Sequence, residues 1–314
     1  MARTGINPAK KFKKIKKDKK LHVIIPVYIP NHHGYFKDSL EIFKNCLNSL
    51  HGSKSCDLNI TVVLNGCDKS VVEFCQGEVK FGRINDLMIL SDNIGKVNAI
   101  LKGVTGSDAE LFLVTDADVL FKKGFDCIIY RFFKDRRAGF LGLQPVYGKS
   151  SYLTSWTRVM LARRMKSVLA EETDIKEHVE FQKSIGKEKI ETLKKISVVK
   201  ISGLDCVLGT GHFCFATHRS TFENVPKLYT EYFISKGTER TFLDQPSFYT
   251  GLLRLSLRTS VALHMGNRIE PWMSKEISNN VQCASMSYLH DNSIPKRRRF
   301  LFPKVVLKII EKIF

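Results

Sequence analysis

The 314-residue sequence predicts an α/β fold with a mostly parallel central sheet flanked by helices. Four short apolar runs, typical of strands buried on both faces, are separated by helical patterns or turn signals. We expect these strands at residues 22–28, 59–64, 87–90 and 111–115. Strands that alternate with helices form parallel sheets with right-handed crossovers. Ligands of such sheets bind beyond the carboxyl ends of the strands.

The segments between these strands support the same fold. Residues 37–50 follow the first strand and place Leu40, Phe43 and Leu47 at helical spacing. The second strand ends at the turn signal Asn65-Gly66. The third strand ends near Asp92, and residues 95–104 are predicted to form the helix that follows.

The formal charge of +19 is concentrated at the two ends of the chain. Residues 1–20 carry nine Lys or Arg against one acid, and residues 296–314 carry seven against one. The region between is only mildly basic and contains no DNA- or RNA-recognition motif, so we expect no nucleic-acid partner. We interpret residues 1–20 as a disordered basic leader. Residues 291–314 are interpreted as an amphipathic tail that binds an anionic membrane surface, the alternative being a helix packed on its own domain.

Cysteine usage and hydropathy bear on the location of the protein. The eight cysteines are scattered, without a CxxC pair or metal-ligand spacing, which indicates reduced thiols. The lysine-rich start is not followed by the cleavage site of a signal peptide. No segment has the roughly 20 apolar residues of a membrane-spanning helix. We therefore expect a cytoplasmic protein peripherally associated with the inner face of the membrane.

Two carboxylates follow the fourth strand directly, in the sequence Asp116-Ala117-Asp118. Side chains at positions i and i+2 of an extended chain point to the same side, so both carboxylates face one site. Two hard oxygen ligands suit Mn²⁺ or Mg²⁺ held jointly by the protein and by substrate phosphates. Paired acids after a strand are also common in ordinary loops, so the pair alone does not assign a function.

Four segments taken in order resemble the nucleotide-binding half of inverting GT-A glycosyltransferases of family two. They are IIPVY at 24–28, VVLNGC at 62–67, NIGKVNA at 93–99 and TDAD at 115–118. The resemblance is close over residues 21–125 and looser beyond. It implies a GT-A (Rossmann-like) catalytic domain over 21–290, made of a nucleotide-sugar-binding half (21–125) and an acceptor half (126–290). Helical spacing and charge within the acceptor half predict a helical insertion at 155–200.

The resemblance implies a set of nucleotide-sugar-binding residues. Those after the first strand pack on the base, the amide after the second contacts it, and the Asn-x-Gly-Lys segment lies near ribose and phosphates. A glycine loop lies under the donor sugar. The implied residues are Pro26, Val27, Tyr28, Asn65, Asp92, Asn93, Gly95, Lys96, Asp116, Ala117 and Gly211. Each also has a structural alternative, such as ending a strand, forming a turn or packing tightly.

This chain departs from the family after its second strand. The family often has two acids where Leu64 and Asn65 stand. An amide still offers a donor and an acceptor to a pyrimidine edge. We therefore favour a UDP-sugar as donor, with a GDP-sugar as the alternative.

The resemblance also implies the catalytic and metal-binding residues. Asp244 stands in the place of the base that takes the proton of the acceptor hydroxyl, although Leu243 replaces the acid that often precedes it. Asp244 could equally cap the helix predicted near Pro246. The implied metal ligands are Asp118, Asp116 and His264, with Asp118 binding directly and Asp116 contacting either the ribose or a metal-bound water.

The sequence thus predicts a metal-dependent glycosyltransferase that uses a nucleotide-sugar donor and a glycan or lipid-linked acceptor. Inversion by direct displacement and a role in surface polysaccharide or lipid-linked glycan synthesis follow from the resemblance and the basic tail. One alternative is a nucleotidyltransferase acting on sugar phosphates, although residues 26–30 lack the Gly-rich basic loop of that class. The other is a non-enzymatic protein that binds anionic polymers, supported by charge alone.

Overall fold

The computed structural model describes residues 20–145, 198–208, 211, 213–223 and 253–274. The described residues exclude all but the last residue of the predicted leader (1–20) and the whole predicted tail (291–314). Of the predicted helical insertion (155–200) they include only 198–200, which belong to a strand. Asp244 also lies outside the described residues. In the part of the chain that the structure describes, no helix combines the length and apolar character needed to span a bilayer.

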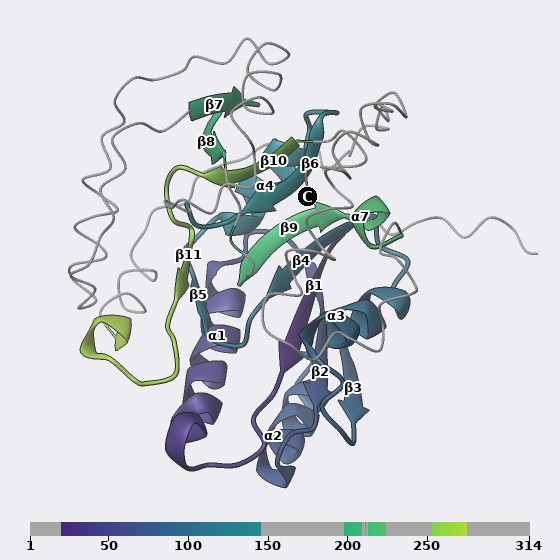
Figure 1. Ribbon diagram of the computed structural model, residues 1–314, viewed down its shortest axis with the longest axis vertical. Coiled ribbons are helices and arrows are strands. Elements are labelled where there is room, and N and C mark those ends of the chain that lie inside the picture. The colour runs from purple at the N-terminus through teal and green to yellow at the C-terminus, as the bar shows by residue number, and fades with distance from the viewer. Residues whose placement is uncertain (1–19, 146–197, 209–210, 212, 224–252, 275–314) are drawn as a thin grey trace, which may run out of the picture.

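The first four strands of the chain form a parallel part of the sheet, as predicted (Figure 1). β1 pairs in parallel with β2 on one side and with β4 on the other, and β2 pairs in parallel with β3. The predicted strand limits agree with the observed ones to within one residue. These strands are β1 (Leu21–Val27), β2 (Leu58–Asn65), β3 (Asp86–Leu90) and β4 (Leu111–Thr115).

Later strands extend this sheet with mixed pairing. They are β6 (Ala138–Gly142), β7 (Val198–Ile201), β8 (Leu204–Leu208), β9 (Cys214–His218) and β10 (Leu253–Leu257). Among the described residues the order of the nine strands is β3-β2-β1-β4-β9-β6-β10-β8-β7. β9 runs antiparallel between β4 and β6, β10 is parallel to β6, and β8 is antiparallel to both β10 and β7. The sheet is therefore mostly parallel, with β8 and β9 reversed.

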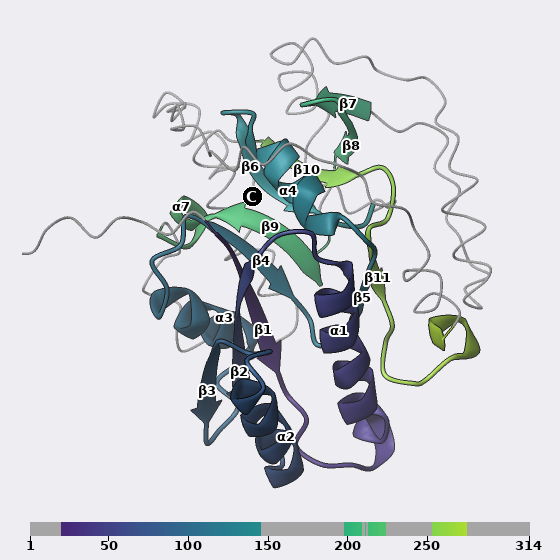
Figure 2. The ribbon, with the colours of Figure 1, turned by 180° about the vertical axis from the view of Figure 1, so that it is seen from behind.

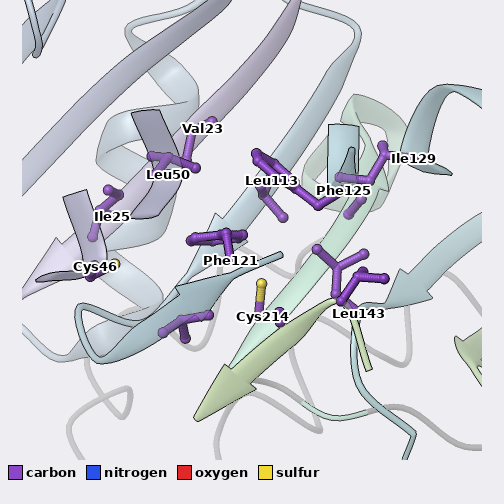
Figure 3. Packing of buried hydrophobic residues seen from close by; sticks show 14 of the residues in the cluster. Val23, Ile25, Cys46, Leu50, Leu113, Phe121, Phe125, Ile129, Leu143 and Cys214 are labelled. Atoms are coloured by element: carbon purple, nitrogen blue, oxygen red, sulfur yellow. The ribbon is translucent and has the colours of Figure 1, made fainter. Parts of the chain in front are cut away.

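Helices cover both faces of the sheet because alternate side chains of its central strands point to opposite sides. Val23 and Ile25 of β1 share one buried cluster with α1, α2 and α4, whereas Ile24 shares the other with α3 and α7. Figure 2 shows α1, α2 and α4 on the near face, and Figure 3 shows the packing of the larger cluster. The helices are α1 (Ser39–Ser53), α2 (Lys69–Lys80), α3 (Lys96–Thr105), α4 (Phe125–Phe133) and α7 (Arg219–Glu223).

A separate two-stranded sheet lies beside α1. It consists of β5 (Val119–Phe121) and β11 (Ala262–His264), which pair antiparallel with His264 opposite Val119. Two serines of α1 bind the backbone of β5: Ser49 Oγ accepts from Phe121 N at 3.1 Å, and Ser53 Oγ donates to Phe121 O at 2.8 Å. This small sheet is thereby fixed to the main body directly after the Asp116–Asp118 segment.

The loop after β2 approaches the loop after β3 so closely that only glycine fits between them. Gly66 has φ of 77°, and a Cβ there would lie 2.8 Å from the backbone N of Asn93. Gly82 has φ of 69° but has open space around the corresponding position. Comparing alanine substitutions at the two glycines therefore separates two energetic costs. One is the left-handed backbone, which both positions share, and the other is the steric clash, which only Gly66 has.

We expect Gly82→Ala to destabilise the protein by about 1–2 kcal/mol, the usual cost of a left-handed non-glycine residue. Gly66→Ala should cost about 1–3 kcal/mol more, because the backbone of Asn93 has to move as well. Urea unfolding of the two variants and the parent measures both costs. Equal destabilisation by the two substitutions would show that the loops after β2 and β3 are not in close contact.

Candidate active site

Two carboxylates and an imidazole meet at the carboxyl end of β4. One ligand atom from each of Asp116, Asp118 and His264 lies within 4.8 Å of the others. His264 Nε2 is 3.1 Å from Asp118 Oδ2. The small sheet produces this arrangement, because β5 begins directly after Asp118 and β11 ends at His264. A backbone hydrogen bond of 2.8 Å from Met265 N to Asp118 O extends the pairing past the end of β11.

The chemistry of this cluster fits a divalent cation. Asp118 Oδ1 is buried and has no hydrogen-bond partner within the described chain. A buried, unpartnered carboxylate oxygen is costly unless a ligand satisfies it. Two carboxylates and one imidazole are a donor set that suits Mn²⁺, and the carboxylates also suit Mg²⁺. The His264 ring is held edge-on to Phe213, with the ring centroids 5.2 Å apart.

Lys96 compensates part of the negative charge of the cluster. Its Nζ lies 2.5 Å from Asp116 Oδ1. Lys96 is the first residue of α3, and Gly95 before it has φ of 85°, a backbone conformation that favours glycine. Burial raises the pKa of Asp116, the ammonium of Lys96 opposes this rise, and the charge of Asp118 adds to it. Among the described residues, the site therefore combines two neighbouring carboxylates with the ammonium group of Lys96 and the imidazole of His264.

An amide network joins the loops after β2 and β3. Asn65 is only 3% exposed. Its Nδ2 donates to Asn93 Oδ1 at 2.8 Å, and its Oδ1 accepts from Ile94 N at 2.9 Å. Asn93 Oδ1 also accepts from Gly95 N at 2.9 Å. Asn65 therefore fixes the loop that leads into Lys96, and its predicted contact with the base stays a prediction.

The loop after β1 carries an exposed aromatic ring. Tyr28 is 43% exposed and packs edge-on against Phe36, with centroids 5.6 Å apart. Val27 is buried, Pro26 is half-buried, and Cys67 connects this loop to the one after β2. Its thiol donates to Val27 O at 3.2 Å. Tyr28 therefore offers a flat apolar surface at the same edge of the sheet as Asn65.

The remaining predicted residues lie around this edge. Asp92 is exposed and accepts a hydrogen bond from Ser91 Oγ at 2.8 Å. Ala117 packs against the buried cluster, and Gly211 is half-buried two residues before Phe213. The structure thus brings Asp116, Asp118, His264 and Lys96 together. The roles assigned to all predicted donor-binding residues stay predictions.

Phe213 is a site residue that the sequence analysis missed. Its carbonyl accepts from Asp116 N at 2.6 Å, and its ring contacts His264. Both contacts depend on the antiparallel pairing of β9 with β4, which brings together segments far apart in sequence. Its position directly after the predicted glycine loop was the only available signal.

The sequence matches a family of known proteins. Residues 12–193, more than half of the chain, match the family model described as Glycosyl transferase family 2. No curated protein matches the sequence.

Several solved structures are similar to the chain. S. aureus TarS 1–349 has 14% identity and a TM-score of 0.47 over 83% of this chain and 64% of that one. Its complex with UDP-GlcNAc has 13% identity and a TM-score of 0.45 over 85% and 68%. Mannosyltransferase PcManGT from Pyrobaculum calidifontis, in complex with GDP-Man and Mn²⁺, has 16% identity and a TM-score of 0.34 over 44% and 40%.

The chain therefore spans less than two thirds of the first of these structures. The mixed α/β sheet, the flanking helices and the matched family model together define a GT-A fold. The chain belongs to glycosyl transferase family 2.

Proposed function

We propose that the protein transfers a sugar from a nucleotide-sugar donor to a hydroxyl acceptor in a metal-dependent reaction. The observation that carries this proposal is the cluster of Asp116, Asp118 and His264, in which a buried carboxylate oxygen has no partner among the described residues. The family match favours glycosyl transfer over a nucleotidyltransferase or a binder of anionic polymers.

Asp118 and His264, with Asp116, would hold Mn²⁺ or Mg²⁺, which acts as a Lewis acid for the charge that develops on the leaving nucleoside diphosphate. Lys96, in contact with Asp116, adds a positive charge beside the same position. The positive end of α3 begins at this residue and favours an anion there. In this proposal the phosphate groups therefore lie beside Lys96 and the start of α3, next to the cation held by the acidic cluster.

The nucleoside would lie over the loops after β1 and β2. Tyr28 supplies an exposed ring for the base, while Asn65 and Asn93 keep the neighbouring loop in place. We favour a UDP-sugar, with a GDP-sugar as the alternative. The acceptor would be a glycan or a lipid-linked saccharide used in surface polysaccharide or lipid-linked glycan synthesis.

Transfer would invert the anomeric centre by direct displacement. Asp244 would take the proton of the acceptor hydroxyl as oxygen attacks the anomeric carbon. The bond from that carbon to the diphosphate breaks in the same step, so no covalent enzyme intermediate is needed. Support for this role is the position of Asp244 in the motif TFLDQP at 241–246.

The metal proposal predicts that nucleotide binding depends on Asp118. Calorimetric titration with UDP and with GDP in Mn²⁺ should detect tighter binding of one nucleotide, and EDTA should weaken it. Asp118→Asn should lower that affinity at least about tenfold, a loss of about 1.4 kcal/mol, because it removes the ligand charge while nearly preserving shape. Thermal unfolding of the variant checks that it folds. Binding of equal strength in EDTA would contradict metal dependence.

The proposed base predicts a different effect for Asp244→Asn. This variant should retain Mn²⁺-dependent nucleotide binding but release the diphosphate from the donor sugar about 10²–10⁴-fold more slowly, the usual contribution of a general base. Glu239→Gln is the matched control, since it neutralises a carboxylate that precedes the motif closely in sequence. It should leave the rate unchanged. A normal rate in Asp244→Asn would exclude the residue as the base.

The basic tail predicts association with anionic membranes from the cytoplasmic side. In liposome flotation, the full chain should float with vesicles that contain anionic lipid, because lysine and arginine are attracted to acidic headgroups. It should not float with neutral vesicles. A chain that ends before Pro295 should lose most of this binding. Equal flotation of the two chains would instead support a tail packed on its own domain.

A further inference from the structure

A second cluster of metal-ligating side chains lies at the start of α4. The Sγ atoms of Cys56 and Cys127 and a carboxylate oxygen of Asp126 lie within 4.8 Å of one another. Cys56 belongs to the loop between α1 and β2, whereas Asp126 and Cys127 belong to the first turn of α4. Both cysteines are free thiols of intermediate exposure. The sequence showed no metal-ligand spacing among its cysteines, because this cluster forms only through tertiary structure.

Asp126 is held rigidly in the middle of this cluster. It is fully buried, and its Oδ2 accepts from Ser55 N and from Cys56 N, each at 2.7 Å. Its Oδ1 accepts from Cys127 N at 3.0 Å. These three backbone donors fix the orientation of the carboxylate, and the side chains of Cys56 and Cys127 also hydrogen-bond to it. Such hydrogen bonds to a ligating carboxylate are typical of metal sites.

The two thiols flank this carboxylate. Cys56 and Cys127 hydrogen-bond each other through their side chains, and Cys127 also bonds with the side chain of Ser55. Burial raises the pKa of Cys56 to about 12, with the charge of Asp126 adding to the effect. The free cluster therefore contains two protonated thiols beside one buried acid.

We propose that Cys56, Cys127 and Asp126 form a binding site for a thiophilic divalent cation such as Zn²⁺. Two sulfur donors and one carboxylate oxygen match the ligands and the tetrahedral preference of Zn²⁺, and the partial exposure of both thiols leaves the fourth position to water. Binding replaces the two thiol protons, which pass to solvent. The sulfur donors also give this site a different metal preference from the cluster of Asp116 and Asp118, whose carboxylates suit harder cations.

The cation would join two parts of the fold that support the active site. Gly124 N, just before α4, donates to Ser53 O at 3.0 Å, and Ser53 Oγ donates to Phe121 O of β5. β5 follows Asp118 directly and pairs with the strand that carries His264. A cation that links the α1–β2 loop to α4 would thus stabilise the packing around β5, the strand that directly follows the acidic pair.

The test uses the full chain, kept reduced with a phosphine and saturated with Mn²⁺ so that the acidic cluster is filled. Titration with Co²⁺ should give near-ultraviolet thiolate-to-cobalt absorption that saturates at one ion per chain and disappears when Zn²⁺ is added. Cys56→Ser and Cys127→Ser should each lose this absorption. Cys67→Ser removes a half-buried thiol elsewhere, and Asp118→Asn alters the acidic cluster, so both should retain it.

Two measurements on the unaltered protein keep the proposal testable if a variant does not fold. Zn²⁺ should slow alkylation of Cys56 and Cys127 by iodoacetamide, as read by peptide mass spectrometry, while leaving Cys67 unaffected. Zn²⁺ should also raise the melting temperature in the presence of Mn²⁺. The proposal is overturned if no thiolate absorption appears, if it persists in both Cys56→Ser and Cys127→Ser, or if Zn²⁺ does not protect these two thiols.

Discussion

The antiparallel pairing of β5 with β11 is the interaction on which the candidate site depends. It places His264 beside Asp118, although a large part of the chain separates the two residues in sequence. The hydrogen bond from Met265 N to Asp118 O continues this pairing, and the serines of α1 fix β5 from the other side. Three-residue strands are marginal by themselves. The geometry of the site is therefore only as stable as the packing of β5 against α1.

The second constraint is charge at the carboxyl end of β4. Two carboxylates in a largely buried position repel each other, and burial alone makes ionisation of Asp116 less favourable. Lys96 offsets part of this cost, and its position depends on Gly95, on the loop of Asn93 and finally on the amide of Asn65. The residues assigned to the nucleotide by resemblance thus also form one connected support for the ammonium group beside Asp116. A donor-binding role and this supporting role are compatible.

Strands β1 to β4 could be predicted from sequence because strands buried on both faces are continuous apolar runs bounded by turn residues. Helix α2 was missed, since few of its side chains are buried and its pattern is correspondingly weak. The reversed strand β9 and the short strands β5 and β11 depend on contacts between distant segments. The spacing of apolar residues along the sequence does not reveal such contacts. Asp116 and Asp118 were identified from spacing, but His264 required the family resemblance and Phe213 required the fold. The sequence assigned Asn65 to the base, but it gave no sign that the side-chain amide hydrogen-bonds to Ile94 N and Asn93 Oδ1.

The two clusters of metal-ligating side chains differ in the way each compensates its charge. In the acidic cluster, Lys96 neutralises one carboxylate, while an oxygen of Asp118 has no partner in the described chain. In the cysteine cluster, three backbone N–H groups hydrogen-bond to Asp126 and hold it in place, and the thiols remain neutral by keeping their protons. The buried oxygen of Asp118 in the first cluster, unpartnered among the described residues, suits a cation that arrives with substrate phosphates. The second cluster already provides hydrogen-bond donors for its buried carboxylate, so a cation bound there would add stability without being needed to offset the charge of Asp126.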